Sequence, residues 1–355
     1  MCLKSNIKLL LTIAIAIMSS HVQAQTLSLQ NVLDAVEQNN PLLASYRFKI
    51  ESANTLASGA RSWMPPKAGI GPYAVPYDLA ANEGSVLFFL EQDIPNPGKL
   101  KAKQNYLSSL SAIDSSERSS VKNELFTEAK NAFTDRFIAE KKLIVINEQI
   151  DLLNLMIKTS IVEYTYNQSD LPTIYKAQAR ASTLEAMRTH ESSAVKEATV
   201  KLNSLMNLYS SNEFMIDSVL PFHDYKLADL DTSILFLTMN NSDISKINHR
   251  INSLQLNNAF TLSSSKPDFN IRYEHYDMFG TTNTFSLVGA VTIPIAPWAS
   301  KGYKSQAAST AKEIDAMNYE KKNSINVARS KIEQTLLHTI SEYQEVKHYS
   351  QQVIP

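Results

Sequence analysis

The sequence has 355 residues, of which only eight are glycine and 13 are proline. Glycine normally makes up about 7% of a protein, so we expect a few long elements and not a many-turned β-sandwich or propeller. The 34 basic and 35 acidic residues nearly cancel, which excludes the strongly basic character of a nucleic-acid-binding protein. The single cysteine, Cys2, excludes a disulfide framework and a zinc site built from thiolates.

The first 24 residues have the pattern of a secretory signal peptide. Lys4 and Lys8 precede an apolar run from Leu9 to Met18, and small residues lead to a cleavage position after Ala24. A membrane-anchoring helix would need about 20 apolar residues, roughly twice the length of this run. We therefore expect residues 1–24 to be removed on export.

An internal repeat organises the rest of the chain. The pair Asn39–Asn40 recurs 201 positions later as Asn240–Asn241, and Pro66 recurs as Pro267 at the same offset. The sequence therefore predicts three parts after the signal peptide. They are a first repeat over 25–209, a linking or equatorial segment over 210–226, and an incomplete second repeat over 227–355.

Each repeat begins with a helix that is followed by two short strands. In the first repeat, apolar spacing predicts a helix over 27–62 with a kink or restart at Pro41. Alternation with period two predicts strands over 68–77 and 85–94, of which the first contains prolines that cannot donate to a strand ladder. The corresponding elements of the second repeat are a helix over 227–264 and strands over 268–274 and 284–293.

A very long helical hairpin follows the first pair of strands. Residues 99–166 contain neither proline nor glycine, and at 1.5 Å per residue such a helix is roughly 100 Å long. A turn at 167–172 leads into a returning helix over 173–209. Apolar residues spaced three and four apart predict a coiled-coil seam on the outgoing helix. They are Leu143, Ile146, Ile150, Leu153, Ile157, Ile161 and Tyr164.

Two segments resemble the outer-membrane efflux channel family typified by TolC. The first is the strand-to-helix exit, Ile94-Pro95-Asn96-Pro97-Gly98-Lys99, whose Pro-Gly-Lys is most similar to members that serve heavy-metal and cation efflux. The second is the hairpin turn, which the family uses as its periplasmic tip. The candidate residues for docking an adaptor there are Tyr164, Asn167, Gln168, Asp170 and Leu171.

The resemblance implies a mainly α fold with a small β part. Long antiparallel coiled-coil hairpins would form a periplasmic tunnel, and four transmembrane β-strands per chain would build a shared barrel of roughly 12 strands in a homotrimer. The protein would lie in the outer membrane of a Gram-negative cell, in contact with its lipid, and extend into the periplasm. It would bind a periplasmic adaptor and an inner-membrane pump, and it would passively export small molecules or metal cations without a cofactor.

The second hairpin turn predicted by the repeat lies beyond the sequence. The repeat offset of 201 residues places this second turn at about residue 368, whereas the sequence ends at Pro355. We therefore expect a chain that is C-terminally truncated relative to the family. Without the second tip, where the family carries its gate, this polypeptide is not expected to make a working tunnel as written.

Some side chains in the strands and at the turn have more than one interpretation. Glu91 and Asp93 are expected to share one face of a strand, and a solvated strand end is favoured over a cation-attracting ring in a lumen. Asp170 is expected to cap the returning helix in preference to contacting an adaptor. Aromatic residues fit a belt at the bilayer interface. The candidates are Phe88, Phe89, Tyr273, Tyr276, Phe279 and Phe285.

The sequence predicts no enzyme and no metal site. Nucleophile elbows, phosphate loops and paired catalytic carboxylates are absent. The histidines are scattered, and none pairs with another at ligand spacing beside a carboxylate. The alternative to a channel is a soluble periplasmic coiled-coil adaptor or scaffold. The scarcity of glycine, and strand pairs that lie between helices, favour the channel.

Overall fold

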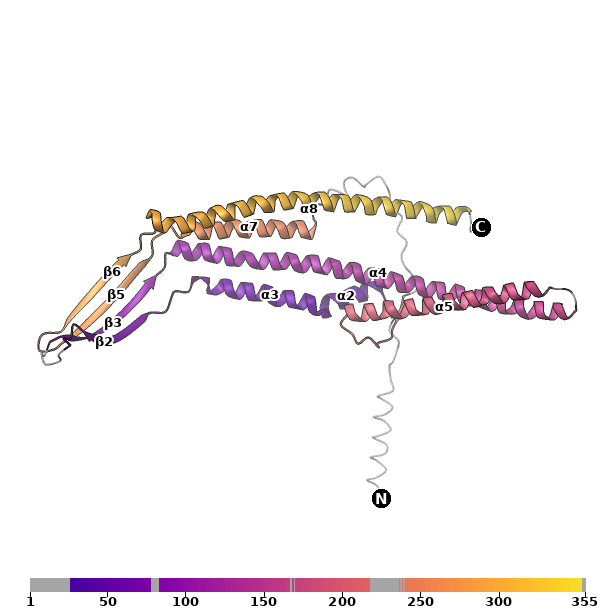
Figure 1. The fold of residues 1–355 in the computed structure, drawn as a ribbon, viewed down its shortest axis with the longest axis horizontal. Helices are drawn as coiled ribbons and strands as arrows, with labels where there is room; N and C mark the ends of the chain where they lie inside the picture. The colour runs from indigo at the N-terminus through magenta and orange to yellow at the C-terminus, as the bar shows by residue number, and fades with distance from the viewer. Residues whose placement is uncertain are drawn as a thin grey trace, which may run out of the picture. The chain divides into compact units, whose positions relative to one another are not determined.

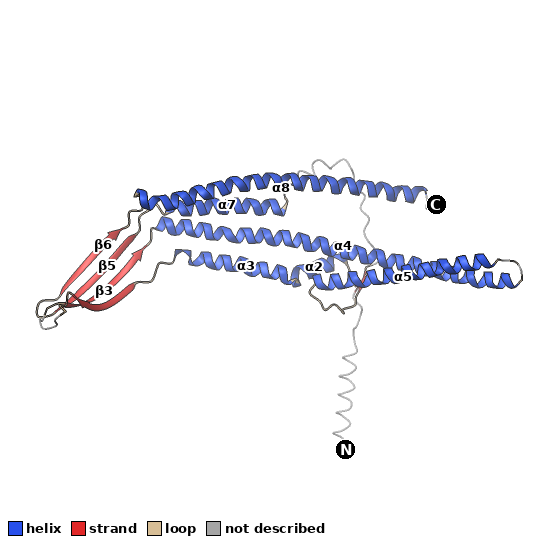
Figure 2. Ribbon diagram, viewed as in Figure 1, coloured by secondary structure: helices blue, strands red, loops and turns tan. Residues whose placement is uncertain are grey.

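The computed structural model describes residues 26–77, 83–166, 168, 170–217, 236, 238 and 240–352. The predicted signal peptide, 1–24, and residues 218–226 of the predicted linker lie outside these residues. The described chain is mainly helical with a small antiparallel sheet, as the sequence predicts (Figure 2). It forms two compact units, one of residues up to Ala44 with Val121–Asp224, the other of Ser45–Ser120 with the residues from Tyr225 onward.

The first unit is a helical body with a small two-stranded sheet. It contains α2 (Leu29–Asn39), α5 (Leu171–Leu205) and the larger part of α4 (Pro97–Thr165). Strands β1 (Thr26–Leu27) and β4 (Met215–Ile216) pair in parallel, a pairing that the sequence did not predict because β4 lies in the expected linker. The buried core joins these elements. Its members include Val32, Val36, Ala129, Phe133, Leu202, Met206 and Ile216.

A repeated asparagine caps a helix in each half of the chain. Asn40 separates α2 from α3 (Pro41–Ser58), which confirms the restart predicted at Pro41. The Oδ1 atom of Asn40 accepts the N–H of Leu42 at 3.0 Å. Asn241, at the matching repeat position, caps α7 (Ser242–Ser263) by accepting the N–H of Asp243 at 2.8 Å. Asparagine is a favoured residue at this position because its short side chain satisfies an otherwise unpaired backbone N–H.

Helices α4 and α5 form the predicted hairpin, and Figure 1 shows them running antiparallel. Both begin two residues earlier than expected, because Pro97 and Pro172 fit the first turn of a helix. The returning helix ends at Leu205 and not at 209, since Asn207 adopts a positive φ of 58°, which cannot continue an α-helix.

The predicted seam of α4 is buried along part of its length. Ile146 and Ile150 are buried against Leu184 of α5, with Leu153 packed beside them. Toward the turn the seam opens, and Ile161 and Tyr164 are each 45% exposed. The spacing therefore predicted the packed face correctly in the middle of the hairpin but not at its tip.

The second unit contains a four-stranded antiparallel sheet. Its strands are β2 (Lys67–Tyr73), β3 (Ser85–Ile94), β5 (Phe269–Met278) and β6 (Thr284–Val291), in the order β2-β3-β5-β6. The central pair, β3 with β5, joins strands from the two predicted repeats. Pro72 lies in β2, at the edge of the described sheet, where a missing N–H is tolerated.

Three strand boundaries differ from the prediction by more than one residue. Strand β2 ends at Tyr73 and not at 77, because Ala74 has a φ of 55° that breaks the extended backbone. Strand β5 continues four residues past 274, since β3 offers it a partner as far as Met278. Strand β6 stops at Val291 and not at 293, shortly before Pro294, which has no N–H to donate.

The long helices of this unit all leave the sheet at the same end of its strands. The register places the start of β2, the end of β3, the start of β5 and the end of β6 at this same end, which we call the helix end of the sheet. Helix α4 follows β3 there, α8 (Pro297–Gln352) follows β6, and α7 packs along α8 (Figure 1). The remainder of α3 and a short 3₁₀ turn, η1 (Gly59–Arg61), lead into β2.

Candidate functional site

One face of the four-stranded sheet is mainly apolar and open, although Gln92, His275 and Asp277 also lie on it. Residues directly opposite each other in neighbouring strands share a face, and the register collects the alternating apolar residues of all four strands on one side. Their exposed fractions range from 37% for Tyr273 to 77% for Ile70. The apolar face comprises Ile70, Phe88, Leu90, Phe269, Ile271, Tyr273, Phe285, Leu287 and Val291.

The opposite face of the sheet carries a network of charged side chains near the helix end, where the long helices begin. The ammonium of Lys67 lies 3.3 Å from Glu91 Oε1 and 3.1 Å from Asp93 Oδ2. The amide of Asn270 donates to Glu91 at 3.1 Å and to Asp93 at 2.7 Å. Both carboxylates share one face, as predicted. They also have partners on neighbouring strands, which the sequence did not predict.

Arg272 extends the polar network toward the turn. Its Nε atom lies 2.8 Å from Glu274 Oε1, and the Tyr276 hydroxyl donates to the same carboxylate at 2.8 Å. The guanidinium carbon of Arg272 lies 4.7 Å from the centre of the Phe89 ring. That ring lies close over Gly69, where a Cβ atom would be only 2.4 Å from Phe89 Cε1.

The six aromatic candidates do not share one face. Phe88, Tyr273 and Phe285 lie on the apolar face, where the rings of Tyr273 and Phe285 stack at 6.3 Å. Phe89 and Tyr276 lie on the polar face. Side chains alternate between the two faces of a strand, and Phe89 is one residue from Phe88 on β3, while Tyr276 is three residues from Tyr273 on β5. Phe279 follows β5 at the end of the sheet away from the long helices, where its N–H donates to the carbonyl of Gly84 at 2.9 Å.

The exit motif forms the junction between β3 and α4. Ile94 is the last strand residue, Pro95 and Asn96 bridge, and Pro97 begins the helix. The Oδ1 atom of Asn96 accepts the N–H of Gly98 at 2.9 Å, so Asn96 is the N-cap of α4. Its side-chain amide donates to the carbonyl of Pro267 at 3.1 Å, and this contact ties the helix start to the chain entering β5.

Asp268 completes this junction from the second half of the chain. Its carboxylate accepts the N–H of Asn96 at 2.9 Å and a hydrogen bond from Lys99 Nζ at 2.5 Å. Burial raises the pKa of the Asp268 carboxyl, but the hydrogen bonds from Lys99 and from the Asn96 backbone outweigh it and hold the pKa below its usual range. Asp268 is not among the residues predicted from the sequence, because a partner 169 residues from Lys99 leaves no local pattern.

Replacing Asn96 with alanine is expected to destabilise the helix start by about 1 kcal/mol, the usual cost of losing an N-cap side chain. The contact with Pro267 is lost at the same time. Denaturant unfolding followed by circular dichroism measures the change, with Asn96→Asp as the matched variant that keeps a capping oxygen. Equal stability of the alanine variant and the unsubstituted protein would rule out this role.

Acidification is expected to weaken the junction through Asp268. An unfolded aspartate has a pKa of about 4. Since the folded-state pKa is lower, ionised Asp268 stabilises the fold above that pH, and the contribution disappears as the pH falls through the folded-state pKa. Thermal unfolding from about pH 7 to about pH 3 should show a smaller decline for Asp268→Asn than for the parent and for the control Asp315→Asn. Parallel curves for all three proteins would contradict the assignment.

The hairpin tip presents three of the predicted docking residues on described elements. Tyr164 lies in the last turn of α4, and Leu171 begins α5 and is 41% exposed. Asp170 is at the N-cap position of α5, but its side chain makes no capping hydrogen bond with the backbone, which corrects the expected capping role. The Asp170 carboxylate accepts a hydrogen bond from the Thr173 hydroxyl, which lowers the pKa of that carboxyl. The backbone N–H of Gln168 donates to the carbonyl of Glu163 at 2.9 Å, and Asn167 lies outside the described residues.

Among the described residues, no group of three histidine, cysteine, aspartate or glutamate side chains lies close enough to hold a metal ion. In the same part of the chain, no helix combines the length and the apolar character needed to cross a bilayer.

Comparison with known proteins finds similarity in the fold and not in the sequence. No protein-family model matches the chain, and no curated protein matches its sequence. Nevertheless, 19 chains of solved structures match its fold.

Three of these structures illustrate the likeness. The outer-membrane channel OprN superposes with a TM-score of 0.63 at 12% identity, over 91% of this chain and 79% of OprN. The outer membrane protein VceC of Vibrio cholerae gives 0.60 at 16% identity, over 92% and 79%. CusC, described in terms of transmembrane channel formation, gives 0.63 at 14% identity, over 90% and 78%. The chain therefore has the fold of outer-membrane channels, which confirms the resemblance to the TolC-like family at the level of the fold.

Proposed function

We propose that this chain is a subunit of the outer-membrane exit duct of a tripartite efflux system. In this proposal it lies in the outer membrane of a Gram-negative cell and extends into the periplasm. Small molecules or metal cations pass through it without chemical change. The Pro97-Gly98-Lys99 motif, with its resemblance to cation-efflux members, favours metal cations.

The observation that carries the proposal is the amphipathic sheet. Strands β3 and β5 have ten residues each, the length that crosses a bilayer when tilted, and the edge strands β2 and β6 have seven and eight. The apolar face suits hydrocarbon, and the face with Lys67, Glu91 and Arg272 suits a water-filled lumen. A sheet that has one such face of each kind is the building unit of an outer-membrane barrel.

Four strands do not close a barrel, so the proposal includes a homotrimer. Membrane barrels begin at about eight strands, and unpaired strand edges are not tolerated in lipid. In the described sheet β2 and β6 are the edges. Pairing β6 of one copy with β2 of the next would satisfy them, and three copies would give a barrel of roughly 12 strands.

The helical hairpin is proposed to face the partners in the periplasm. Tyr164, Asn167, Gln168, Asp170 and Leu171 at the α4–α5 turn are the proposed contacts with a periplasmic adaptor, which links the duct to an inner-membrane pump. The aromatic belt is proposed in a narrower form, with Phe88, Tyr273 and Phe285 on the lipid side.

Fractionation and cross-linking test the proposal together. The mature chain has no cysteine once residues 1–24 are removed, so Ile70→Cys on β2 and Leu287→Cys on β6 introduce unique reactive sites. Within one copy these strands are three spacings or about 14 Å apart, so a bis-maleimide that spans about 8 Å joins only neighbouring copies. We expect the protein in the outer-membrane fraction and cross-linked products up to a trimer, with none from either single-cysteine variant.

Two outcomes would contradict the proposal in different ways. A protein recovered in the soluble periplasmic fraction would support the alternative of a soluble coiled-coil adaptor or scaffold. A membrane-bound protein without cross-links between β2 and β6 would retain the location but exclude the shared barrel.

A further inference from the structure

Both tryptophans of the chain lie at the helix end of the sheet, where the strands join the long helices. The sequence contains two tryptophans. Trp63 precedes the start of β2 at Lys67, and Trp298 lies in the first turn of α8, shortly after the end of β6. Their exposed fractions are 54% and 85%. Large aromatic side chains this exposed are unusual in water, and tryptophan is enriched where a membrane-spanning segment meets the headgroup region.

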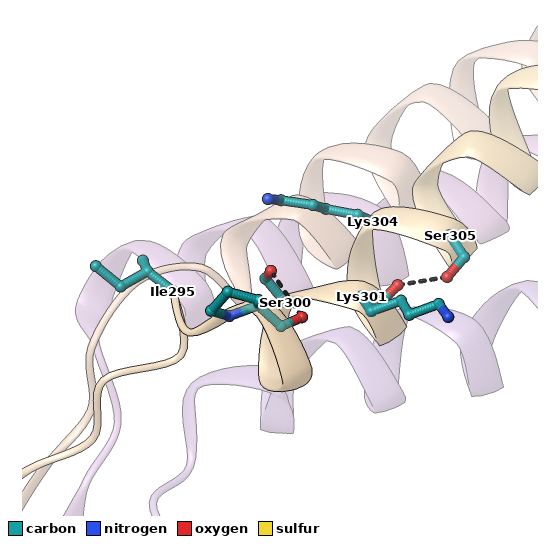
Figure 3. A pocket seen from close by; sticks show the side chains of 6 residues that line it. Ile295, Ser300, Lys301, Lys304 and Ser305 are labelled. Atoms are coloured by element: carbon teal, nitrogen blue, oxygen red, sulfur yellow. Dashed lines mark hydrogen bonds between the residues drawn. The ribbon is translucent and has the colours of Figure 1, made fainter.

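Two exposed isoleucines lie in the chain between β6 and Trp298. Ile293 and Ile295 follow Val291, the last paired residue of β6, and they are 72% and 68% exposed. Ile295 lines an open hollow of about 600 Å³ at the start of α8 (Figure 3). The rest of its lining is one proline and four polar or basic residues. It consists of Pro297, Ser300, Lys301, Lys304 and Ser305.

The two lysines of the hollow are placed differently. Figure 3 shows Lys304 extended toward the side of Ile295, where the strand ends, and Lys301 directed the opposite way along the helix. The hydroxyl of Ser300 donates to the Pro297 carbonyl at 3.5 Å, and that of Ser305 donates to the Lys301 carbonyl. Of the two lysines, Lys304 is therefore the one directed toward Ile295.

No acidic side chain of this segment balances these charges. Between Asp277 and Glu313 the sequence has no aspartate or glutamate. Among the described residues, neither Lys301 nor Lys304 forms an ion pair, in contrast to Lys99 at the other junction, which pairs with Asp268. An apolar and aromatic surface that leads directly into unpaired positive charge is complementary to a phospholipid, with its acyl chains on one side and its phosphate on the other.

We propose that Trp63, Trp298, Ile293, Ile295, Lys301 and Lys304 form a junction patch that binds phospholipid headgroups of the periplasmic leaflet. The tryptophans lie at the boundary between hydrocarbon and headgroups, and Lys304, assisted by Lys301, contacts the lipid phosphate. By binding at this boundary, the patch fixes how deep in the membrane the sheet ends and the long helices begin. This inference rests on the proposed function, because it requires the sheet to lie in the membrane.

Tryptophan fluorescence tests the patch directly, because it contains every tryptophan of the chain. Trp63→Phe leaves Trp298 as the sole reporter, and Trp298→Phe leaves Trp63. Each variant is reconstituted into vesicles of phosphatidylethanolamine and phosphatidylglycerol that carry brominated acyl chains. We expect stronger quenching by bromines near the carboxyl end of the acyl chain than by bromines near its methyl end, and protection from aqueous iodide.

A second measurement isolates the charge. With dansyl-labelled phosphatidylglycerol, energy transfer from Trp298 reports the preference for anionic over zwitterionic lipid. We expect Lys304→Gln and Lys301→Gln each to reduce this preference by up to about fivefold, with the larger effect at Lys304. Lys331→Gln on the same helix α8 serves as the control and should retain the preference.

The outcomes separate the patch from the function on which it rests. A protein that fails to float with vesicles would overturn both. A protein that floats but whose tryptophans remain open to iodide, or whose lysine variants keep the full lipid preference, would overturn only the patch. If inorganic phosphate in detergent without lipid reproduces the change in Trp298 emission, the site binds free phosphate and the lipid assignment is wrong.

Discussion

Replacing Leu287 with arginine is expected to destabilise the membrane-inserted protein by about 2–4 kcal/mol. Leu287 lies near the middle of β6 on the apolar face and is 68% exposed in the single chain. In the proposed barrel this position faces hydrocarbon, where a guanidinium loses its hydration without gaining a partner. The variant should be depleted from the outer membrane, and after reconstitution it should unfold at lower denaturant concentration than the parent.

The neighbouring residue provides a matched control for this substitution. Ser286→Arg introduces the same side chain one position earlier, on the opposite face and directly across from Glu274. A guanidinium there lies in the proposed lumen beside a carboxylate, so we expect the variant to insert normally. Urea titrations of both proteins in the same vesicles make the comparison. Equal destabilisation by the two substitutions would show that the faces are not distinguished by lipid and water.

Replacing Phe133 with alanine is expected to destabilise the first unit by about 3–5 kcal/mol, the typical cost of emptying an aromatic core position. Phe133 is 1% exposed and belongs to the core that joins α2, α4 and α5, with Val36 and Leu202 among its members. The cavity lies where the neighbouring helices are held by the rest of the core, so little collapse can compensate for it.

Phe48→Ala makes the same chemical change on an open surface. Phe48 lies on α3 and is 59% exposed, so we expect its replacement to cost less than about 0.5 kcal/mol. Equilibrium unfolding of the mature chain, followed by the helical circular dichroism signal, measures both variants. A Phe133 variant as stable as the Phe48 variant would show that this core does not hold the unit together.

The features that the sequence predicted well are those that depend on near neighbours. The alternation in β3 placed Val86, Phe88 and Leu90 on one face, and the register of the sheet confirms this arrangement. The absence of proline and glycine after Lys99 predicted a helix that the structure extends from Pro97 to Thr165. These patterns are local because strand alternation and helix propagation depend on residues at most four positions away.

The features that the sequence missed depend on contacts between distant segments. Nothing near β3 indicates that it pairs with β5, and nothing near Phe89 indicates that this ring lies under Arg272 on the polar face. The grouping of six aromatic residues into one belt came from composition, which does not distinguish the two sides of a strand.

The sequence by itself determined the long helices, the alternating strands, the helix restart at Pro41 and the resemblance carried by the exit motif. Only the tertiary structure decided which strands are neighbours, and therefore that four separate stripes of apolar side chains form one continuous face. It also decided that Asp268 closes the junction begun by Asn96 and Lys99. The physical reason is range: capping and periodicity are satisfied within one or two turns of chain, whereas faces and ion pairs are created when segments more than 150 residues apart are brought together.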